Sequence, residues 1–259
     1  TYITTPSVNE KFAKVNVRTK VVLPEGADPA KYSVETSVWN PNKQKLTAVR
    51  TSLAQMKYNN NQAEQEFVIQ APSLWSPEMP ALYSAETRLY EGDKLKDIYT
   101  TPFGIRSIEI IPDKGFFLNG KRTVFKGVCN HHDLGPLGAA VNDAAIRRQI
   151  RILKDMGCNA IRTSHNMPAP ELIRACDEMG MMIMAESFDE WNVAKCKNGY
   201  NLLFDEWAEK DLVNLLHNFR NNPSVVMWCI GNEVPNQWNE GDCKIAKWLQ
   251  DICHREDPT

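Results

Sequence analysis

The chain has 259 residues, 42% of them hydrophobic, which is enough to bury one large core or two ordinary ones. Its formal net charge is −2, which gives no reason to expect nucleic acid or an anionic membrane as a partner. No apolar run reaches the ~20 residues of a membrane span. The N-terminus carries no signal-peptide pattern, and because the chain opens on Thr1 we expect an excised fragment of undetermined localisation.

The first hundred residues alternate between apolar and polar side chains. Val15 and Val17 point to one side, whereas Lys14 and Asn16 point to the other, and the same alternation returns in residues 32–38 and 83–89. A period of two residues predicts strands with one buried and one solvated face. Turn signals separate about seven such strands. Residues 1–102 are therefore predicted to form an antiparallel β-sandwich of immunoglobulin type.

From residue 103 onward, apolar strands alternate with amphipathic helices. The first predicted helix spans residues 142–156, with Asn142 or Asp143 as its N-cap and Gly157 at its end. Pro170 near the start and Gly180 after the end delimit the second. The remaining predicted strands and helices are 122–130, 158–164, 181–187, 205–220, 224–230 and 243–255. Four strand–helix units in a row predict an α/β domain with a parallel sheet over residues 103–259.

Two architectures fit four such units: a doubly wound sheet and a TIM (β/α)8 barrel. No Gly-rich phosphate loop follows the first strand. Instead, polar side chains follow every strand: His131, His132 and Asp133; Arg162, Ser164 and His165; Glu186 and Asp189; Asn232 and Glu233. A ring of polar groups at strand ends is typical of a barrel active site, and a complete barrel needs about 250 residues. We therefore predict the first four units of a barrel, truncated.

Asn232 and Glu233 follow the buried fourth strand directly. We expect partial burial to let the Glu233 carboxyl keep its proton at neutral pH and act as a general acid. Asn232 can both donate to and accept from a sugar hydroxyl. The alternative is a structural one, in which Asn232 caps a helix and Glu233 begins it. Asp155, Asp177 and Glu178 lie on predicted helices and are expected to face solvent.

Seven cysteines are scattered through the C-terminal part without any CxxC pair. This spacing argues against a disulfide or zinc framework, and we expect most of them to be small buried hydrophobic residues. His131 and His132 are adjacent, so their side chains should point to opposite faces of a strand, and a metal site is not predicted there.

Four segments resemble glycoside hydrolase family 2, the family of β-galactosidases and β-glucuronidases. They are "LWSPEMPALY" with "FGIR", "FFLNGKRTVFKGVCNHHD", "LKDMGCNAIRTSHNMP" and "RNNPSVVMWCIGNE", in the order the family has them. The resemblance implies an immunoglobulin-like domain followed by the first half of the catalytic barrel. It makes Glu233 the acid/base and places Asn232 on the sugar 2-hydroxyl. His131, His165 and Arg162 would line or support the pocket.

Glu190 aligns with a family carboxylate that binds magnesium in some β-galactosidases. The histidine that follows it there is replaced by Asn192, so neither magnesium nor another cofactor is predicted. Glu190 remains a candidate substrate-binding residue, and the apolar face of Trp191 is a candidate stacking platform for a sugar ring. Glu186 belongs either to the active site or to a structural ion pair with Arg162.

The family is retaining, and its nucleophile is a Glu on the seventh barrel strand, which these residues do not reach. The resemblance thus predicts a glycosidase acting on β-linked oligo- or polysaccharides, with galactosides favoured, represented by an inactive fragment. The open strand edges of half a barrel favour homo-oligomerisation. Two other functions remain: a metal-dependent barrel hydrolase using His131, His165, Glu186 and Asp189, and a non-catalytic carbohydrate-binding module formed by the sandwich.

Overall fold

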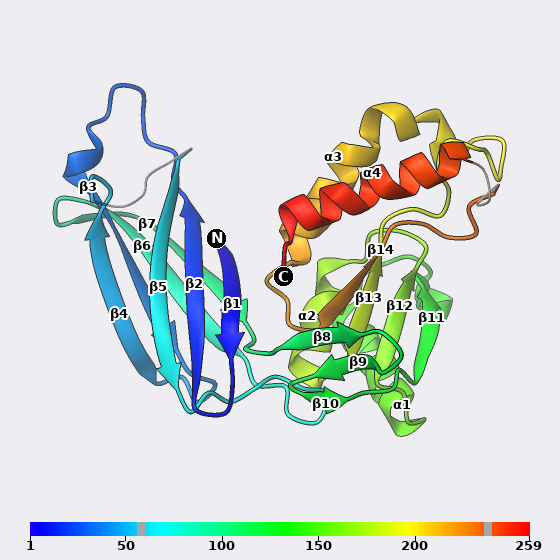
Figure 1. Cartoon of the computed structure of the whole chain (residues 1–259), viewed down its shortest axis with the longest axis horizontal. Helices are drawn as coiled ribbons and strands as arrows, with labels where there is room; N and C mark the ends of the chain where they lie inside the picture. The colour runs from blue at the N-terminus through cyan, green and yellow to red at the C-terminus, as the bar shows by residue number, and fades with distance from the viewer. Residues whose placement is uncertain (56–60, 236–239) are drawn as a thin grey trace. The chain divides into compact units, whose positions relative to one another are not determined.

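The computed structural model describes residues 1–55, 61–235 and 240–259, and Figure 1 shows its elements. Contacts divide the chain into two compact units, Thr1–Thr123 and Val124–Thr259. The division falls later than residue 102 because three short strands, absent from the sequence-based prediction, pack with the first unit. No helix in the described ranges is long and apolar enough to cross a membrane.

The first unit contains two antiparallel sheets. One has the order β1-β2-β5, formed by Tyr2–Val8, Phe12–Lys20 and Gln62–Gln70. The other has the order β4-β3-β6-β7, formed by Lys45–Ser52, Tyr32–Trp39, Tyr83–Glu91 and Lys94–Phe103. Val15 and Val17 of the first sheet and Val38 and Ala85 of the second are buried in one core. The predicted immunoglobulin-like sandwich is confirmed, because the alternating apolar residues face that core.

A three-stranded meander completes the first unit. It consists of β8 (Ile108–Ile111), β9 (Gly115–Leu118) and β10 (Lys121–Arg122), in the order β10-β9-β8. Asn119 and Gly120 connect β9 to β10 with φ angles of 53° and 74°, the left-handed conformation that a tight hairpin requires. This Asn-Gly pair was the signal for the missed hairpin.

The second unit contains four parallel strands in sequence order, which lie side by side in Figure 1. They are β11 (Gly127–His131), β12 (Ala160–Ser164), β13 (Met182–Glu186) and β14 (Val225–Cys229). The helices that alternate with them are α1 (Asp143–Asp155), α2 (Pro170–Met179), α3 (Phe204–Phe219) and α4 (Glu240–Glu256). The strand order never reverses, as it would in a doubly wound sheet.

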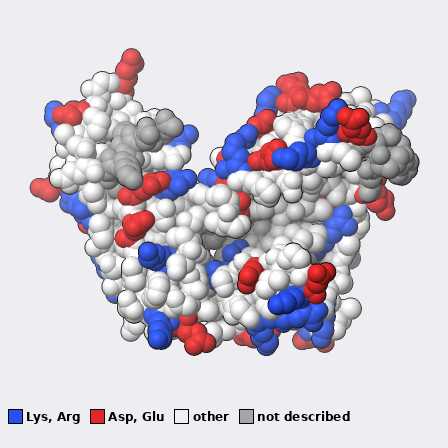
Figure 2. Space-filling model, viewed as in Figure 1, with Lys and Arg blue, Asp and Glu red and all other residues white. Residues whose placement is uncertain are grey.

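The helices begin and end where the sequence indicates. The side chain of Asn142 accepts a hydrogen bond from the Ala145 N–H and caps α1. Pro170 is the first residue of α2, and Gly180 ends it with a φ of 73°. Over α3 and α4, basic and acidic residues are interspersed on the face shown in Figure 2. Their opposite, apolar sides pack on the sheet.

One face of the parallel sheet carries the core of the second unit. Ile161, Ile183, Ala185 and Val225 pack there against all four helices. On the other face, residues of the four strands line a hollow of about 260 Å³ that includes Cys129, Arg162, Met184 and Met227. The strands of a TIM barrel have the same two faces: the outer face packs against the helices, and the inner face carries the functional side chains.

All seven cysteines are free thiols. Only Cys176 and Cys253 are buried, whereas Cys129, Cys196 and Cys243 are exposed, so the expectation that most are buried is wrong. Burial raises the pKa of Cys253 to about 11, and that of Cys176 well above its usual value. Cys129 is exposed because it lies on the uncovered face of the sheet.

Asp177 does not face solvent as predicted. It is 3% exposed, its Oδ1 accepts the Ser224 N–H at 3.0 Å, and its Oδ2 accepts from Asn222 Nδ2 at 2.5 Å. Asp177 therefore joins α2 to the turn that leads into β14. Asp155 and Glu178 are exposed, as expected.

Replacing Asp177 with Ala should lower the free energy of unfolding by about 1–3 kcal/mol, because the buried Ser224 N–H loses its acceptor. Urea unfolding followed by tryptophan fluorescence measures the change. Asp155→Ala removes an exposed helical carboxylate and should change the free energy by less than ~0.5 kcal/mol. If the two variants unfold alike, Asp177 has no such structural role.

Candidate active site

The predicted polar residues meet at the carboxyl edge of the parallel sheet. In the strand register, Cys129 lies beside Arg162, His131 beside Ser164, and Glu186 beside Cys229. Arg162 pairs with Met184, so Glu186, two residues further along β13, lies on the same face as Arg162. The strands therefore bring His131, Arg162 and Glu186 to one side of the sheet.

A bidentate ion pair forms the centre of the site. Arg162 donates from Nε to Glu186 Oε2 at 2.6 Å and from Nη2 to Glu186 Oε1 at 3.0 Å. The Glu186 side chain is completely buried, so this pairing satisfies a carboxylate that would otherwise be costly. Burial alone would lower the pKa of Arg162, but hydrogen bonding and attraction to Glu186 outweigh it and raise that pKa. Of the two roles left open for Glu186, the ion pair with Arg162 is present in the structure, and Arg162 stays charged.

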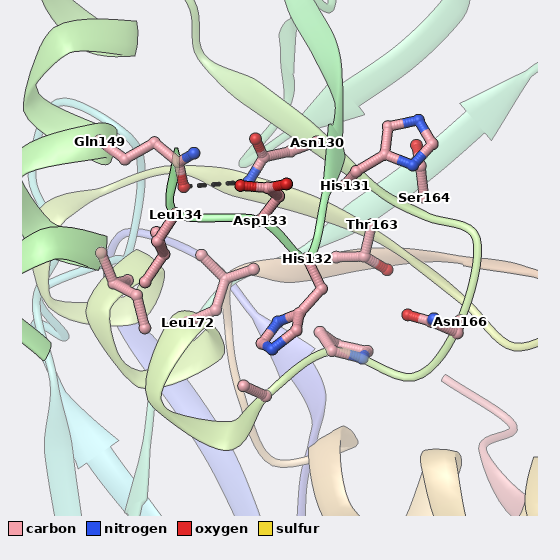
Figure 3. Close-up of a pocket in the computed structure, with 13 residues that line it drawn as sticks. Asn130, His131, His132, Asp133, Leu134, Gln149, Thr163, Ser164, Asn166 and Leu172 are labelled. Carbon is pink, nitrogen blue, oxygen red and sulfur yellow. Dashed lines mark hydrogen bonds between the residues drawn. The ribbon is translucent and has the colours of Figure 1, made fainter. Parts of the chain in front are cut away.

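His165 is the second contact of Glu186. Its Nδ1 lies 3.0 Å from Glu186 Oε1, and its ring meets the His131 ring edge-on with 5.1 Å between centroids. The structure thus brings both predicted pocket histidines together. His132 points away from His131 in Figure 3, and its Nε2 lies 2.9 Å from the Ala139 carbonyl oxygen. The adjacent histidines do face different directions, as the strand geometry predicts.

Asn232 connects the ion pair to a second carboxylate. Its Oδ1 accepts from Arg162 Nη2 at 2.9 Å, and its Nδ2 donates to Asp189 Oδ1 at 3.0 Å. Asn232 is 7% exposed, so these bonds hold its amide in one orientation. Burial would raise the pKa of Asp189, but the bonds from Asn232 and Lys195 outweigh it and lower that pKa. Asp189 is therefore a carboxylate at neutral pH.

Glu233 is exposed, in contrast to the partial burial that the sequence indicated. It lies four residues beyond Cys229, the last residue of β14, and solvent can reach its carboxyl group in the described part of the chain. Its φ of 41° is left-handed, which is uncommon for a residue with a side chain. Such backbone conformations are concentrated at functional sites, where surrounding contacts fix them.

Glu190 and Trp191 do not face the hollow. Glu190 is 3% exposed, and its carboxylate accepts the backbone N–H groups of Lys195 at 2.6 Å and Asn201 at 2.9 Å. Trp191 is 5% exposed and donates from Nε1 to the Ile230 carbonyl at 2.8 Å. A ring this buried offers no open face to a sugar, so we reassign both residues from substrate binding to holding the loop that follows β13.

The donor chemistry of the site does not fit the alternative of a metal-dependent hydrolase. The guanidinium of Arg162 already binds both oxygens of Glu186, where a divalent cation would have to compete with a fixed positive charge. Within the described residues, no group of three or more His, Cys, Asp or Glu side chains is placed to hold a metal ion.

A second hollow, drawn in Figure 3, lies between the loop after β11 and the start of α2. Asn130, His132, Thr163 and Asn166 are among its lining residues. Its cavity volume of about 30 Å³ is that of one water molecule, so it cannot hold a sugar ring. The hollow over Arg162 and Met184, at about 260 Å³, is the larger of the two, whereas His131 lines the smaller one.

One residue of this site, Lys195, is absent from the sequence-based prediction. Lys195 Nζ donates to Asp189 Oδ1 at 3.1 Å and to the Asn232 carbonyl at 2.8 Å. No periodicity or motif marks a lysine within a polar loop. Its position depends on the path of residues 187–203, which the strand and helix pattern does not determine.

An immunoglobulin-like sandwich followed by the start of a TIM barrel, with Asn-Glu after the fourth barrel strand, defines the class of barrel glycoside hydrolases. Profile comparison agrees: residues 109–259 match "Glycosyl hydrolases family 2, TIM barrel domain", and residues 1–106 match "Glycosyl hydrolases family 2". The chain belongs to glycosyl hydrolases family 2.

Individual relatives agree with this assignment. The chain is 44% identical to β-galactosidase BoGH2A of Bacteroides ovatus over 93% of its own length and 28% of that protein. It is 36% identical to a putative β-glucuronidase of Formosa agariphila over 90% of its length and 22% of that protein. A Bacteroides vulgatus β-glycosidase structure superposes with a TM-score of 0.88 at 35% identity, covering 99% of this chain and 32% of that one. The chain thus spans about a third or less of these relatives.

Proposed function

We propose that this chain supplies the acid/base part of the active site of a retaining β-glycosidase. The observation that carries the proposal is the placement of Asn232 and Glu233 directly after the fourth parallel strand, with Arg162 joining Asn232 to the buried Glu186. The nucleophilic carboxylate is contributed by chain outside these 259 residues. This division agrees with the share of 28% that the chain covers in the Bacteroides ovatus β-galactosidase.

In this proposal Glu233 acts twice. Its protonated carboxyl gives a proton to the glycosidic oxygen as the bond from that oxygen to the anomeric carbon breaks, while the nucleophile forms an ester with the same carbon. The Glu233 carboxylate then takes a proton from water, whose oxygen attacks the anomeric carbon and releases the nucleophile. Two inversions retain the configuration. Glu233 is exposed in these residues, so water and leaving group can both reach it, and in this proposal the burial that keeps its proton comes from chain outside them.

The side chains that contact Asn232 and Glu186 support the two roles proposed for Glu233. Asn232, fixed by Arg162 and Asp189, retains one N–H and one lone pair for a sugar hydroxyl. Arg162 and His165 present positive or polar groups around Glu186 at the floor of the site. We favour β-galactosides as substrates, in line with the higher identity to the β-galactosidase than to the β-glucuronidase.

A panel of nitrophenyl glycosides tests both parts of this proposal on the full-length protein that contains these residues. We expect turnover of the β-galactoside, with the β-anomer of galactose as the first product in proton NMR. Preference for the β-glucuronide would correct the sugar and leave the mechanism standing. Release of the α-anomer would contradict retention. The 259 residues alone should show no turnover, because one carboxyl group of the pair is absent.

A further inference from the structure

Lys195 links the two ends of the candidate site. Its Nζ lies 3.1 Å from Asp189 Oδ1, in the loop after β13, and 2.8 Å from the Asn232 carbonyl oxygen, after β14. The side chain is 24% exposed, which is low for a lysine in a surface loop. A charged donor to a carbonyl oxygen forms one of the stronger types of hydrogen bond in proteins.

The backbone of Lys195 is itself held in place. Its N–H donates to Glu190 Oε2 at 2.6 Å, and the other oxygen of the same carboxylate accepts the Asn201 N–H at 2.9 Å. Gly199 packs directly on this carboxylate: a Cβ at that position would lie 1.8 Å from Glu190 Oε1. Glu190 thus closes residues 190–201 into a loop of fixed shape, and Lys195 projects from it in a set direction.

The carbonyl that Lys195 binds belongs to the peptide bond between Asn232 and Glu233. Arg162 and Asp189 fix the side chain of Asn232, but neither contacts this peptide group. Lys195 supplies that contact and so sets the plane of the peptide bond. Glu233 follows with the unusual φ of 41°, so the direction of its side chain depends on this plane.

We propose that Lys195 is a positioning residue for the acid/base carboxyl: through the Asn232 carbonyl and Asp189 it orients Glu233 toward the glycosidic oxygen. The inference rests on the proposed function and adds a residue to it. Lys195 contacts neither the substrate nor the reacting atoms. Its loss should therefore impair proton transfer while leaving sugar binding largely as it was.

The test compares Lys195→Met, Lys195→Arg and Lys197→Met in the full-length enzyme. Lys197 lies in the same loop and is exposed, so its variant is the matched control. For Lys195→Met we expect kcat/KM, which reports the glycosylation step, to fall by about 10–100-fold on an alkyl galactoside, since misplacing a catalytic group by about 1 Å costs about that much. On a dinitrophenyl galactoside the loss in kcat/KM should be less than about threefold, because that leaving group departs without a proton. KM should stay nearly unchanged, and Lys195→Arg should recover most of the loss.

Two outcomes would overturn the inference. One is a Lys195→Met variant with wild-type kcat/KM on the alkyl substrate, and the other is an equal loss of kcat/KM on both substrates. Amine labelling with acetic anhydride gives a readout that does not need activity: Lys195 should react more slowly than Lys197 in the wild type, and equal reaction would also contradict the contact. A wild-type enzyme without activity on any glycoside would instead refute the proposed function.

Discussion

The Glu233→Gln variant of the full-length enzyme should lose about 10²–10⁴-fold in kcat/KM on alkyl galactosides. The substitution removes the transferable proton while nearly keeping the shape of the side chain. Activated aryl galactosides should lose much less in the glycosylation step, because their leaving groups need no proton. The measurement is a plot of log kcat/KM against the pKa of the leaving group, which should become steep in the variant.

Glu240→Gln is the matched control for this variant. Glu240 is an exposed carboxylate at the start of α4, paired with Lys244 one helical turn away. Replacing it should leave kcat and KM unchanged. If Glu233→Gln kept wild-type rates on both kinds of substrate, Glu233 would not be the proton donor.

The Arg162→Met variant should show the largest loss of stability. It leaves the completely buried Glu186 without its bidentate partner, and breaking such a pair typically costs about 3–5 kcal/mol. It also removes the hydrogen bond from Arg162 to the amide oxygen of Asn232. Glycosidase activity should therefore fall as well as stability. Chemical denaturation gives the first quantity and a glycosidase assay gives the second.

The double variant Arg162→Met/Glu186→Leu separates structure from function. Replacing both members of a buried pair with apolar residues is often neutral, so a large part of the lost stability should return. Activity should not return, because Asn232 has then lost its bond from Arg162 and His165 has lost its contact with Glu186. A double variant that is no more stable than Arg162→Met would show that the pair is not coupled as the structure indicates.

Much of the fold could be predicted because local sequence patterns determine its strands and helix ends. The alternation of apolar and polar residues around Val15 predicts the sandwich, and the structure confirms the helix ends predicted at Asn142, Pro170 and Gly180. The Asn-Gly hairpin at residues 119–120 is absent from the prediction, whose first barrel strand begins at residue 122 and takes in the second strand of the hairpin only at Arg122. The pairing of Arg162 with Glu186 was one of two alternatives that the sequence left open for Glu186, and the structure shows the pair.

The loop residues were harder to interpret because their roles depend on where the backbone goes. Glu190 and Trp191 follow the end of β13 by four and five residues, yet both turn inward and hold the loop. Asp177 has the helical position of a solvated residue but meets the turn before β14. No periodicity or motif marks Lys195. The partners of Trp191 and Asp177 lie 39 and 47 residues away along the chain, and those of Glu190 lie within its own irregular loop, so local periodicity predicts none of these contacts.

Trapping with azide tests the role of Glu233 most directly. In Glu233→Ala of the full-length enzyme, azide enters the space left by the carboxylate and attacks the glycosyl-enzyme without needing a base. With a dinitrophenyl β-galactoside, we expect turnover to rise with azide and the product to be the β-galactosyl azide. Formation of the α-azide would make Glu233 the nucleophile, and a variant that hydrolyses alkyl galactosides at the wild-type rate would contradict any catalytic role.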